Sequence, residues 1–328
     1  MGQVTPRLEL VALPAKRGGP DLARDAREGL FAKRKHLPAA HFYDESGSRL
    51  FEEITRLPEY YLSRTELSIL KAHAQDIARA SAAHTALVEL GSGSSQKTRA
   101  LIEALLARQG AVHYVAIDIS RTALVDAAKA LLHDYPNLTV TALAGDYDAG
   151  LDWLKENAQG PKLVLYLGSS LGNFQPARAK SLLSSVARTL ARGDGLILGA
   201  DLQKDVRVVE AAYNDAAGVT AKFNLNLLRR LNYQLGAQFA PEDFLHRAFY
   251  NRRAHKIEMH LQSLRAHSVP IAALGRAVAF TRGETIHTED SHKYTLPQLD
   301  ALAASAGLHR RAAWLDPLRW FSVTRFEP

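Results

Sequence analysis

Short apolar segments alternate with amphipathic segments through the middle of the chain. Segments with the length and apolar content of buried strands cover residues 85–90, 112–117, 138–144, 162–167 and 195–199. Between them, apolar residues recur at helical spacing over residues 97–108 and 122–132. This alternation predicts an α/β fold with a doubly wound parallel sheet, whose ligands bind beyond the carboxyl ends of the strands.

Residues 202–287 lack this alternation and predict an insertion into the sheet-forming domain. The pattern favours helix over residues 208–230 and strands near 256–264 and 277–281. A final helix over residues 296–306 and a strand over 320–326 resume the α/β pattern.

The segments before the first strand have three different characters. Residues 1–20 are rich in proline and glycine and predict a loose arm. Residues 21–35 and 65–82 have helical spacing, whereas residues 36–61 are dense in aromatic residues and turn formers.

Composition excludes several kinds of protein. The chain has 328 residues, is 47% hydrophobic and has no apolar run near the roughly 20 residues that a transmembrane helix needs. Residues 1–20 lack the apolar centre of a secretory signal, so we expect a cytoplasmic protein with no membrane partner. Without a repeat or a heptad pattern, we expect a monomer.

Metal and nucleic-acid binding are weakly indicated. The absence of cysteine excludes thiolate metal sites, and the 13 histidines show no H-E-x-x-H pattern, so we expect no metal site. The net charge is +7, but the basic residues are dispersed, and their densest clusters are pairs such as Arg229 and Arg230. We interpret these pairs as solvated faces and expect no nucleic-acid partner.

The first strand ends in a glycine turn, L-V-E-L-G-S-G-S-S-Q-K-T over residues 87–98. Gly91 and Gly93 let the backbone approach a ligand closely, but Gln96 stands where a dinucleotide-binding turn has its third glycine. The acidic residue before the turn and the helix after it resemble the first motif of Rossmann-like methyltransferases more than that of a nicotinamide enzyme.

Carboxylates follow the next two strands. Asp118 has the position to accept ribose hydroxyls, or alternatively to cap the next helix. Asp146 has the position to accept the adenine amino group with Tyr147 stacking on the ring, or alternatively to serve a turn.

The loop after the fourth strand reads L-G-S-S-L-G-N-F over residues 167–174. Asn173 offers donors and an acceptor for a carboxylate or an amine, or alternatively is a turn residue. The loop lacks the N-P-P-Y/F pattern of nucleic-base methyltransferases, which counts against a DNA or glutamine-amide acceptor.

Longer motifs carry a more specific resemblance. These are F-Y-D at 42–44, I-T-R-L-P-E-Y-Y at 54–61, G-S-S-L-G-N at 168–173, Y-N-D-A-A-G-V-T at 213–220, I-E-M at 257–259 and T-E-D-S at 288–291. In order and content, the chain from about residue 21 resembles the histidine Nα-methyltransferases of ergothioneine biosynthesis.

The resemblance implies a Rossmann-like class I methyltransferase sheet with an inserted α+β substrate-binding domain. Residues 21–61 plus 202–287 would form a discontinuous substrate-binding domain, and residues 62–201 plus 288–328 the S-adenosylmethionine-binding domain. The implied reaction is the trimethylation of the α-amine of L-histidine, with S-adenosyl-L-homocysteine as the second product.

The resemblance also implies site residues. The cofactor residues are Gly91, Gly93, Lys97, Asp118, Asp146 and Tyr147, the last where the family leads us to expect phenylalanine. Asn173 and Tyr213 would hold the substrate carboxylate. The imidazole would be contacted by Tyr60, Glu289 and Ser291. The remaining pocket residues would be Tyr43, Phe51, Gly168, Thr220 and Met259.

The chemistry of these residue types agrees with the implied roles. Glu289 and Ser291, two residues apart on a strand, would share a face and bond the two imidazole nitrogens, one as acceptor and one as donor. A neutral amine is needed for attack, and Tyr43 is a candidate proton acceptor, as are solvent and a backbone carbonyl.

Alternatives remain for several of these residues. Tyr60 also suits a core, Glu289 a solvated strand and Met259 a gap in a core. The alternative activity is methylation of the amine of another amino acid such as tryptophan.

Overall fold

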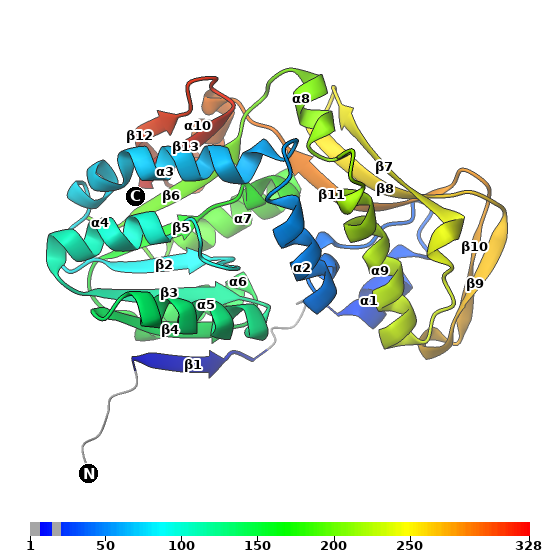
Figure 1. Cartoon of the computed structure of the whole chain (residues 1–328), viewed down its shortest axis with the longest axis horizontal. Helices are drawn as coiled ribbons and strands as arrows, with labels where there is room; N and C mark the ends of the chain where they lie inside the picture. The colour runs from blue at the N-terminus through cyan, green and yellow to red at the C-terminus, as the bar shows by residue number, and fades with distance from the viewer. Residues whose placement is uncertain (1–6, 15–20) are drawn as a thin grey trace, which may run out of the picture. The chain divides into compact units, whose positions relative to one another are not determined.

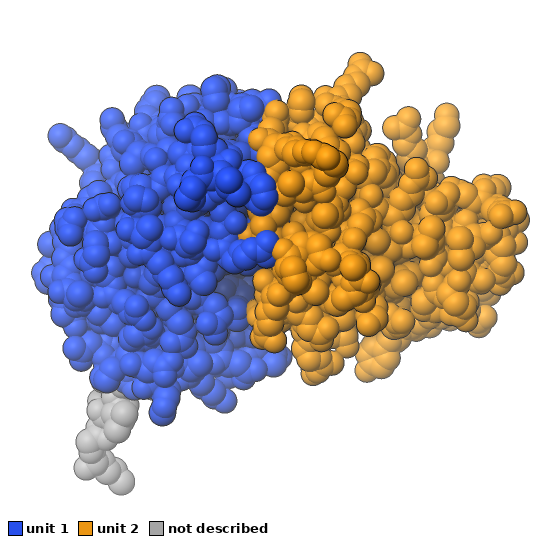
Figure 2. Space-filling view, turned by 45° about the horizontal axis from the view of Figure 1, so that its top comes forward, with its two compact units in different colours: residues 1–17, 62–202, 294–328 blue, residues 18–61, 203–293 orange. Residues whose placement is uncertain are grey.

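The structure is a computed structural model that describes residues 7–14 and 21–328. The chain divides into two compact units (Figure 2). Unit 1 comprises residues 1–17, 62–202 and 294–328, and unit 2 comprises residues 18–61 and 203–293. No helix among the described residues has the length and apolar character needed to cross a membrane.

Unit 1 is built on a sheet whose strand order is β1-β4-β3-β2-β5-β6-β13-β12 (Figure 1). Its strands are β1 (Leu8–Ala12), β2 (Ala86–Leu90), β3 (Val112–Asp118), β4 (Leu138–Ala144), β5 (Lys162–Tyr166), β6 (Gly195–Asp201), β12 (His309–Leu315) and β13 (Phe321–Glu327). Strands β1 to β6 pair in parallel, and β13 pairs antiparallel with both β6 and β12. This arrangement confirms the predicted doubly wound α/β sheet of Rossmann-like type.

The helices of unit 1 follow the strands in the order expected for crossover connections. They are α3 (Tyr61–Arg79), α4 (Arg99–Gln109), α5 (Arg121–Asp134), α6 (Tyr147–Asn157), α7 (Pro176–Ala187) and α10 (Leu296–Ala304), with the short 3-10 helix η2 (Ser170–Asn173). The apolar faces of α6, α7 and α10 pack on the central strands in one core, which includes Val88, Val115, Val164, Leu196, Leu154, Leu182 and Leu299. Burial on both faces explains why the central strands are continuous apolar runs.

Unit 2 contains a three-stranded antiparallel sheet, β11-β8-β7, and a two-stranded sheet, β10-β9. Its strands are β7 (Phe244–Asn251), β8 (Lys256–Ser263), β9 (His267–Ile271), β10 (Arg276–Phe280) and β11 (Thr285–His292). Its helices are α1 (Leu22–Gly29), α2 (Glu45–Ile54), α8 (Val206–Ala211) and α9 (Val219–Leu235), with the 3-10 helices η1 (Ala39–Phe42), η3 (Pro241–Asp243) and η4 (Ala272–Leu274).

The expectation of a loose arm over residues 1–20 is wrong for residues 8–12, which form a strand. Leu8–Ala12 forms β1, which pairs in parallel with β4 from Leu8↔Val140 to Ala12↔Ala144. The backbone of this edge strand gains ladder hydrogen bonds, which composition alone does not reveal. Residues 1–6 and 15–20 of the expected arm lie outside the described residues.

Two expected segments of unit 2 also differ. The helix expected over residues 21–35 ends at Gly29. The helical region expected over 208–230 is two helices, because residues 212–218 form a turn in which Gly218 adopts φ +69°. The domain boundary expected at 287/288 falls inside β11, and the chain enters unit 1 after Lys293 instead.

Candidate active site

The glycine turn after β2 adopts a backbone that only glycine accommodates easily. Gly91 and Gly93 have φ of +74° and +48°. A Cβ atom at Gly91 would lie 2.7 Å from the Tyr147 hydroxyl oxygen. Tyr147 thus fills the space beside Gly91, whereas no atom lies within 4 Å of a Cβ atom built at Gly93, so Gly93 is the open position of the turn. The role of the turn toward a cofactor stays a prediction.

Asp118 is held beside this turn by backbone donors. Gly93 N–H donates to Asp118 Oδ2 at 2.9 Å, and Ser120 N–H donates to Oδ1 at 2.9 Å. The N-cap of α5 is Ser120, so the alternative in which Asp118 caps that helix is wrong. Burial raises the pKa of Asp118, and the hydrogen bonds from Ser120 and Gly93 oppose the rise. The structure thus joins two of the predicted cofactor residues directly.

Asp146 has a structural task of its own. It is the N-cap of α6, and its Oδ1 accepts from Ala149 N–H at 2.8 Å. Tyr147 begins the same helix, and its ring meets the Tyr166 ring edge-on with centroids 5.6 Å apart. Burial raises the pKa of the Tyr147 hydroxyl. Asp146 therefore caps a helix, and its role toward adenine stays a prediction.

A buried carboxylate that sequence reasoning missed links two loops of unit 1. Glu66, on α3, is fully buried, and both of its oxygens accept from Gly168 N–H at 2.9 Å. It also forms an ion pair with Lys97, which follows the glycine turn. Glu66 therefore fixes the loop after β2 and the loop after β5 at once.

The signal for Glu66 was present in the helical pattern. Glu66 precedes the fully buried Leu70 by four residues and so lies on the same face of α3. The neighbouring Leu67, although apolar, is only partly buried. A carboxylate on an apolar helix face requires partners, and Lys97 and Gly168 supply them.

The loop after β5 turns sharply at its first residues. Gly168 and Ser169 have φ of +77° and +59°, and Ser169 Oγ accepts from Asp201 N–H at 2.9 Å. Asn173 ends η2 and is partly exposed. Gly168 and Asn173 belong to unit 1, whereas the other predicted substrate residues belong to unit 2.

In unit 2, the predicted pocket aromatics lie in contact with one another. Ring centroids are 5.7 Å apart for Tyr43 and Phe51, 6.2 Å for Phe51 and Tyr60, and 6.4 Å for Tyr60 and Tyr213. Phe223 of α9, which the sequence reasoning missed, lies 5.9 Å from Tyr43 and 6.1 Å from Phe51. These rings, brought together from α2, α9 and the segments around them, form a continuous aromatic group.

A polar network joins this aromatic group to β11. The Tyr213 hydroxyl donates to Ser291 Oγ at 2.8 Å. The Lys293 ammonium donates to the Tyr213 hydroxyl at 3.0 Å and to Ser291 Oγ at 2.9 Å. Lys293, a further residue that we missed, is only 2% exposed. The sequence signal for Lys293 is its spacing, because Glu289, Ser291 and Lys293 follow one another at intervals of two residues. Side chains at this interval on an extended chain point to the same face.

Glu289 is a buried carboxyl group, not the solvated strand charge of the alternative interpretation. It is 9% exposed and pairs in register with Met259 on β8, which is 1% exposed. Burial raises the pKa of Glu289 to about 7, while the Lys293 charge lowers it and Asp290 raises it further. Its charge is therefore sensitive to small changes in its surroundings near neutral pH.

Thr220 lies in the first turn of α9. Asp215 supplies the cap of that turn, since Oδ2 accepts from Val219 N–H at 2.7 Å and Oδ1 from Thr220 N–H at 2.8 Å. The motif Y-N-D-A-A-G-V-T is thus a helix entry that holds Tyr213 and Thr220 at its two ends.

Among the described residues, Glu258, His260 and His287 form a further group of potential ligands. We expected no metal site because these residues match no spacing motif along the chain. The pairing of β8 with β11 brings them together, which linear spacing does not show.

The sheet order, the glycine turn and the carboxylates after β3 and β4 place unit 1 among the class I, S-adenosylmethionine-dependent methyltransferases. The chain belongs to the family of histidine-specific, S-adenosylmethionine-dependent methyltransferases, which it matches over residues 22–328. The family inferred from the sequence motifs is confirmed.

Named relatives agree with this family. The chain is 42% identical to a histidine N-alpha-methyltransferase of Mycolicibacterium smegmatis, over 92% of this chain and 94% of that protein. It is 40% identical to a histidine N-alpha-methyltransferase of Mycobacterium tuberculosis, with the same shares covered. It is 33% identical to ergothioneine biosynthesis protein 1 of Neurospora crassa, over 85% of this chain but 32% of that longer protein.

Proposed function

We propose that this protein transfers methyl groups from S-adenosyl-L-methionine to the α-amine of L-histidine, in three successive transfers that give trimethylhistidine for ergothioneine biosynthesis. The observation that carries the proposal is the buried group of Glu289, Ser291, Tyr213 and Lys293 beside an aromatic group in unit 2. Family membership and the named relatives support it.

The residues of unit 1 fit the cofactor. The open glycine turn, the Asp118 carboxylate fixed by Gly93 and the Lys97 ammonium fixed by Glu66 suit a ligand with a ribose and a charged amino-acid end. We assign Gly91, Gly93, Lys97, Asp118, Asp146 and Tyr147 to it. When bound, S-adenosylmethionine supplies an electrophilic methyl group on a sulfonium.

The residues of unit 2 suit an imidazole. A carboxylate at Glu289 accepts from one ring N–H, and the Ser291 hydroxyl donates to the other nitrogen. The Lys293 ammonium donates a hydrogen bond to Ser291 Oγ, so the hydroxyl proton of Ser291 points away from Lys293 and is available for donation to another acceptor. An amino acid that lacks the two ring nitrogens leaves these buried groups unpaired. A hydrogen-bonding site of this kind therefore discriminates against such an amino acid by about 10⁴-fold in favour of histidine.

The aromatic group suits the amine. Each transfer consumes the lone pair of a neutral nitrogen, so a proton must leave the amine before the first and each later transfer until the nitrogen is quaternary. We assign to the Tyr43 hydroxyl oxygen the role of accepting a hydrogen bond from the amine N–H, which favours release of the amine proton to solvent. The faces of Tyr43 and Phe51 favour the growing positive charge by cation–π contact, worth about 0.5–2 kcal/mol.

Other assignments complete the proposal. Asn173 and Tyr213 are assigned to the substrate carboxylate, a role in which the Tyr213 hydroxyl turns its proton from Ser291 Oγ to that carboxylate. Tyr60, Gly168, Thr220 and Met259 are assigned to the walls of the substrate site. Location in the cytoplasm and a monomeric state belong to the same proposal.

Replacement of Glu289 by alanine tests the substrate role. We expect Glu289→Ala to lose turnover of histidine by about 10- to 100-fold, because a hydrogen bond to a charged group contributes about 1.5–3 kcal/mol, while affinity for S-adenosylhomocysteine stays within about twofold. Glu242→Ala, at an exposed glutamate in η3, is the matched control and should retain activity. Retained histidine turnover in Glu289→Ala would remove Glu289 from the site.

A further inference from the structure

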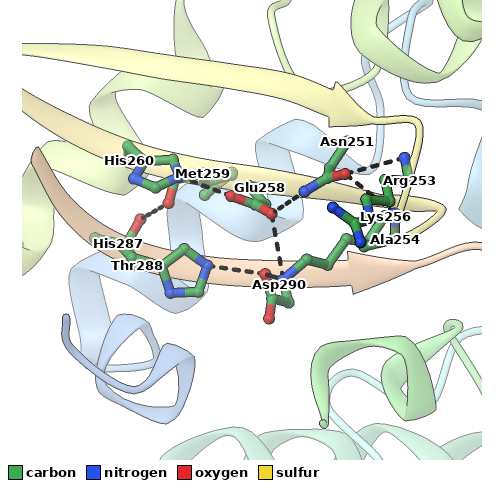
Figure 3. Close-up of polar contacts among 10 residues, drawn as sticks. All are labelled: Asn251, Arg253, Ala254, Lys256, Glu258, Met259, His260, His287, Thr288 and Asp290. Carbon is green, nitrogen blue, oxygen red and sulfur yellow. Dashed lines mark hydrogen bonds and ion pairs between the residues drawn. The ribbon is translucent and has the colours of Figure 1, made fainter. Parts of the chain in front are cut away.

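A group of histidine and acidic side chains gathers on the three-stranded sheet of unit 2 (Figure 3). Glu258 and His260 come from β8, and His287 and Asp290 come from β11. One potential ligand atom from each of Glu258, His260 and His287 lies within 4.8 Å of the other two. The three side chains are therefore close enough together to bind one metal ion after only small movements of their ligand atoms.

Strand register, not chain proximity, assembles this group. In the antiparallel pair, His287 lies opposite His260 and Asp290 lies opposite Glu258. A β-bulge between His287 and Glu289 inserts the extra residue that allows both pairings. Bulges of this kind re-aim side chains, and here the bulge keeps two side chains of β11 in line with two of β8.

The group lies on the face of the sheet opposite the proposed substrate residues. Along β8, the partly exposed Glu258 and His260 alternate with the buried Ile257 and Met259. Met259 pairs with Glu289, so both lie on the other face. The proposed imidazole site therefore does not account for the histidine and acidic group.

The histidine rings are held in place and remain reachable. The His260 ring stacks on Phe249, with centroids 5.4 Å apart and planes inclined by 11°. His287 Nε2 lies 2.8 Å from Asp290 Oδ1, the carboxylate–histidine pairing that orients metal ligands in many sites. The side chains of His260 and His287 are 14% and 29% exposed, so an ion from solvent has access.

Lys256 is the cation that this group holds in the structure. Its ammonium lies 2.7 Å from Asp290 Oδ1 and 3.3 Å from Glu258 Oε1. One ammonium balances one of the two carboxylates, which leaves a net negative charge beside two imidazoles. A divalent ion would satisfy that charge and compete with Lys256 for Glu258.

We propose that Glu258, His260 and His287 bind a divalent transition metal ion of the Zn²⁺ type, with Asp290 orienting His287 and Lys256 acting as the internal competitor. Two imidazoles and a carboxylate are a ligand set that Zn²⁺ uses with a fourth position left to water. The ion would cross-link β8 to β11 on the face of β11 opposite to Glu289 and Ser291.

The test is Zn²⁺ binding to the metal-stripped, tag-free full chain, measured by isothermal titration. Free histidine is omitted because it chelates Zn²⁺ and would mask the site. We expect a specific site that binds one ion per chain in the wild type. His260→Ala and His287→Ala should each weaken that site by at least about tenfold. His309→Ala, at an exposed histidine on β12, is the matched control and should leave it unchanged.

Two further variants guard against misfolding as an explanation. Lys256→Met removes the competitor and should tighten Zn²⁺ binding, an outcome that loss of structure does not produce. His260→Gln keeps a polar side chain beside Phe249 and should fold like the wild type while weakening the site. Wild-type binding no tighter than that of His260→Gln and His287→Ala would overturn the proposal, as would a Lys256→Met variant that binds no more tightly.

Discussion

The Glu66 carboxylate should control how tightly unit 1 binds its cofactor. Glu66→Gln keeps the side-chain volume and leaves an amide oxygen to accept from Gly168 N–H. It removes the charge opposite Lys97, so the ammonium loses the partner that fixes its position. The variant thus separates the electrostatic role of Glu66 from its packing role.

The expected size of the effect follows from the contacts. A hydrogen bond to a charged group contributes about 1.5–3 kcal/mol. The Lys97 side chain is 24% exposed, so solvent recovers part of the loss and the lower figure applies. About 1.5 kcal/mol corresponds to an affinity for S-adenosylhomocysteine about tenfold weaker than that of the wild type.

Isothermal titration with S-adenosylhomocysteine measures this affinity, and thermal unfolding of the same samples reports the stability of the fold. Glu103→Gln, at an exposed glutamate on α4, is the matched control and should bind like the wild type. Glu66→Ala should be worse than Glu66→Gln, because it also leaves the Gly168 N–H without its acceptor. Affinity in Glu66→Gln within about twofold of the wild type would refute the reasoning.

Three further predictions concern both units. Gly91→Ala should weaken S-adenosylhomocysteine binding, because the new Cβ atom clashes with the Tyr147 hydroxyl and alanine disfavours the left-handed φ of +74°. Adding Tyr147→Phe should restore only part of the affinity, because it removes the clash while the backbone conformation still costs about 1–2 kcal/mol. Complete restoration would contradict the backbone argument. Because the pKa of Glu289 is raised to about 7, kcat/KM for histidine should fall as the pH drops through that value, which gives the pH profile an acidic limb. Glu289→Gln should lose this acidic limb, and an unchanged profile would show that Glu289 is not its origin. Lys293→Met should move the same limb to higher pH, because the ammonium lowers the pKa of Glu289, and a limb that stays in place would show that Lys293 does not act on it.

The raised pKa of Glu289 also sets the sign of its effect on stability. The unfolded carboxyl ionises at its ordinary value of 4.5, whereas the folded one ionises at about 7, so the native state binds more protons between these values. Its contribution therefore becomes less favourable as the pH rises from 4.5 to about 7, and denaturant unfolding of Glu289→Gln should lack this part of the decline.

The central sheet could be predicted because its strands are buried on both faces. Residues 138–144 form β4 with the predicted bounds, and the glycine turn and Asp118 were placed by their positions at strand ends. Strand β1 was missed although L-E-L-V-A is apolar at four of its five positions, because Pro6 and Pro14 flank it and its pairing partner β4 lies far away along the chain.

The polar strands of unit 2 were the hardest elements to predict. Strand β11, T-I-H-T-E-D-S-H, buries a threonine, a glutamate, an aspartate and a serine, so its pattern does not alternate between apolar and polar residues. Lys293 and Glu66 were missed for a related reason, since each is a charged residue whose partners come from distant segments. The group of Glu258, His260 and His287 depends on strand register, which no local pattern contains.

The proposed activity is tested most directly by incubating the purified protein with S-adenosyl-L-methionine and each of the twenty amino acids, with the products read by mass spectrometry. The account predicts that histidine alone gains methyl groups, up to three on its α-amine. Methylation of another amino acid with histidine left unchanged would contradict the assignment of Glu289 and Ser291 to the imidazole.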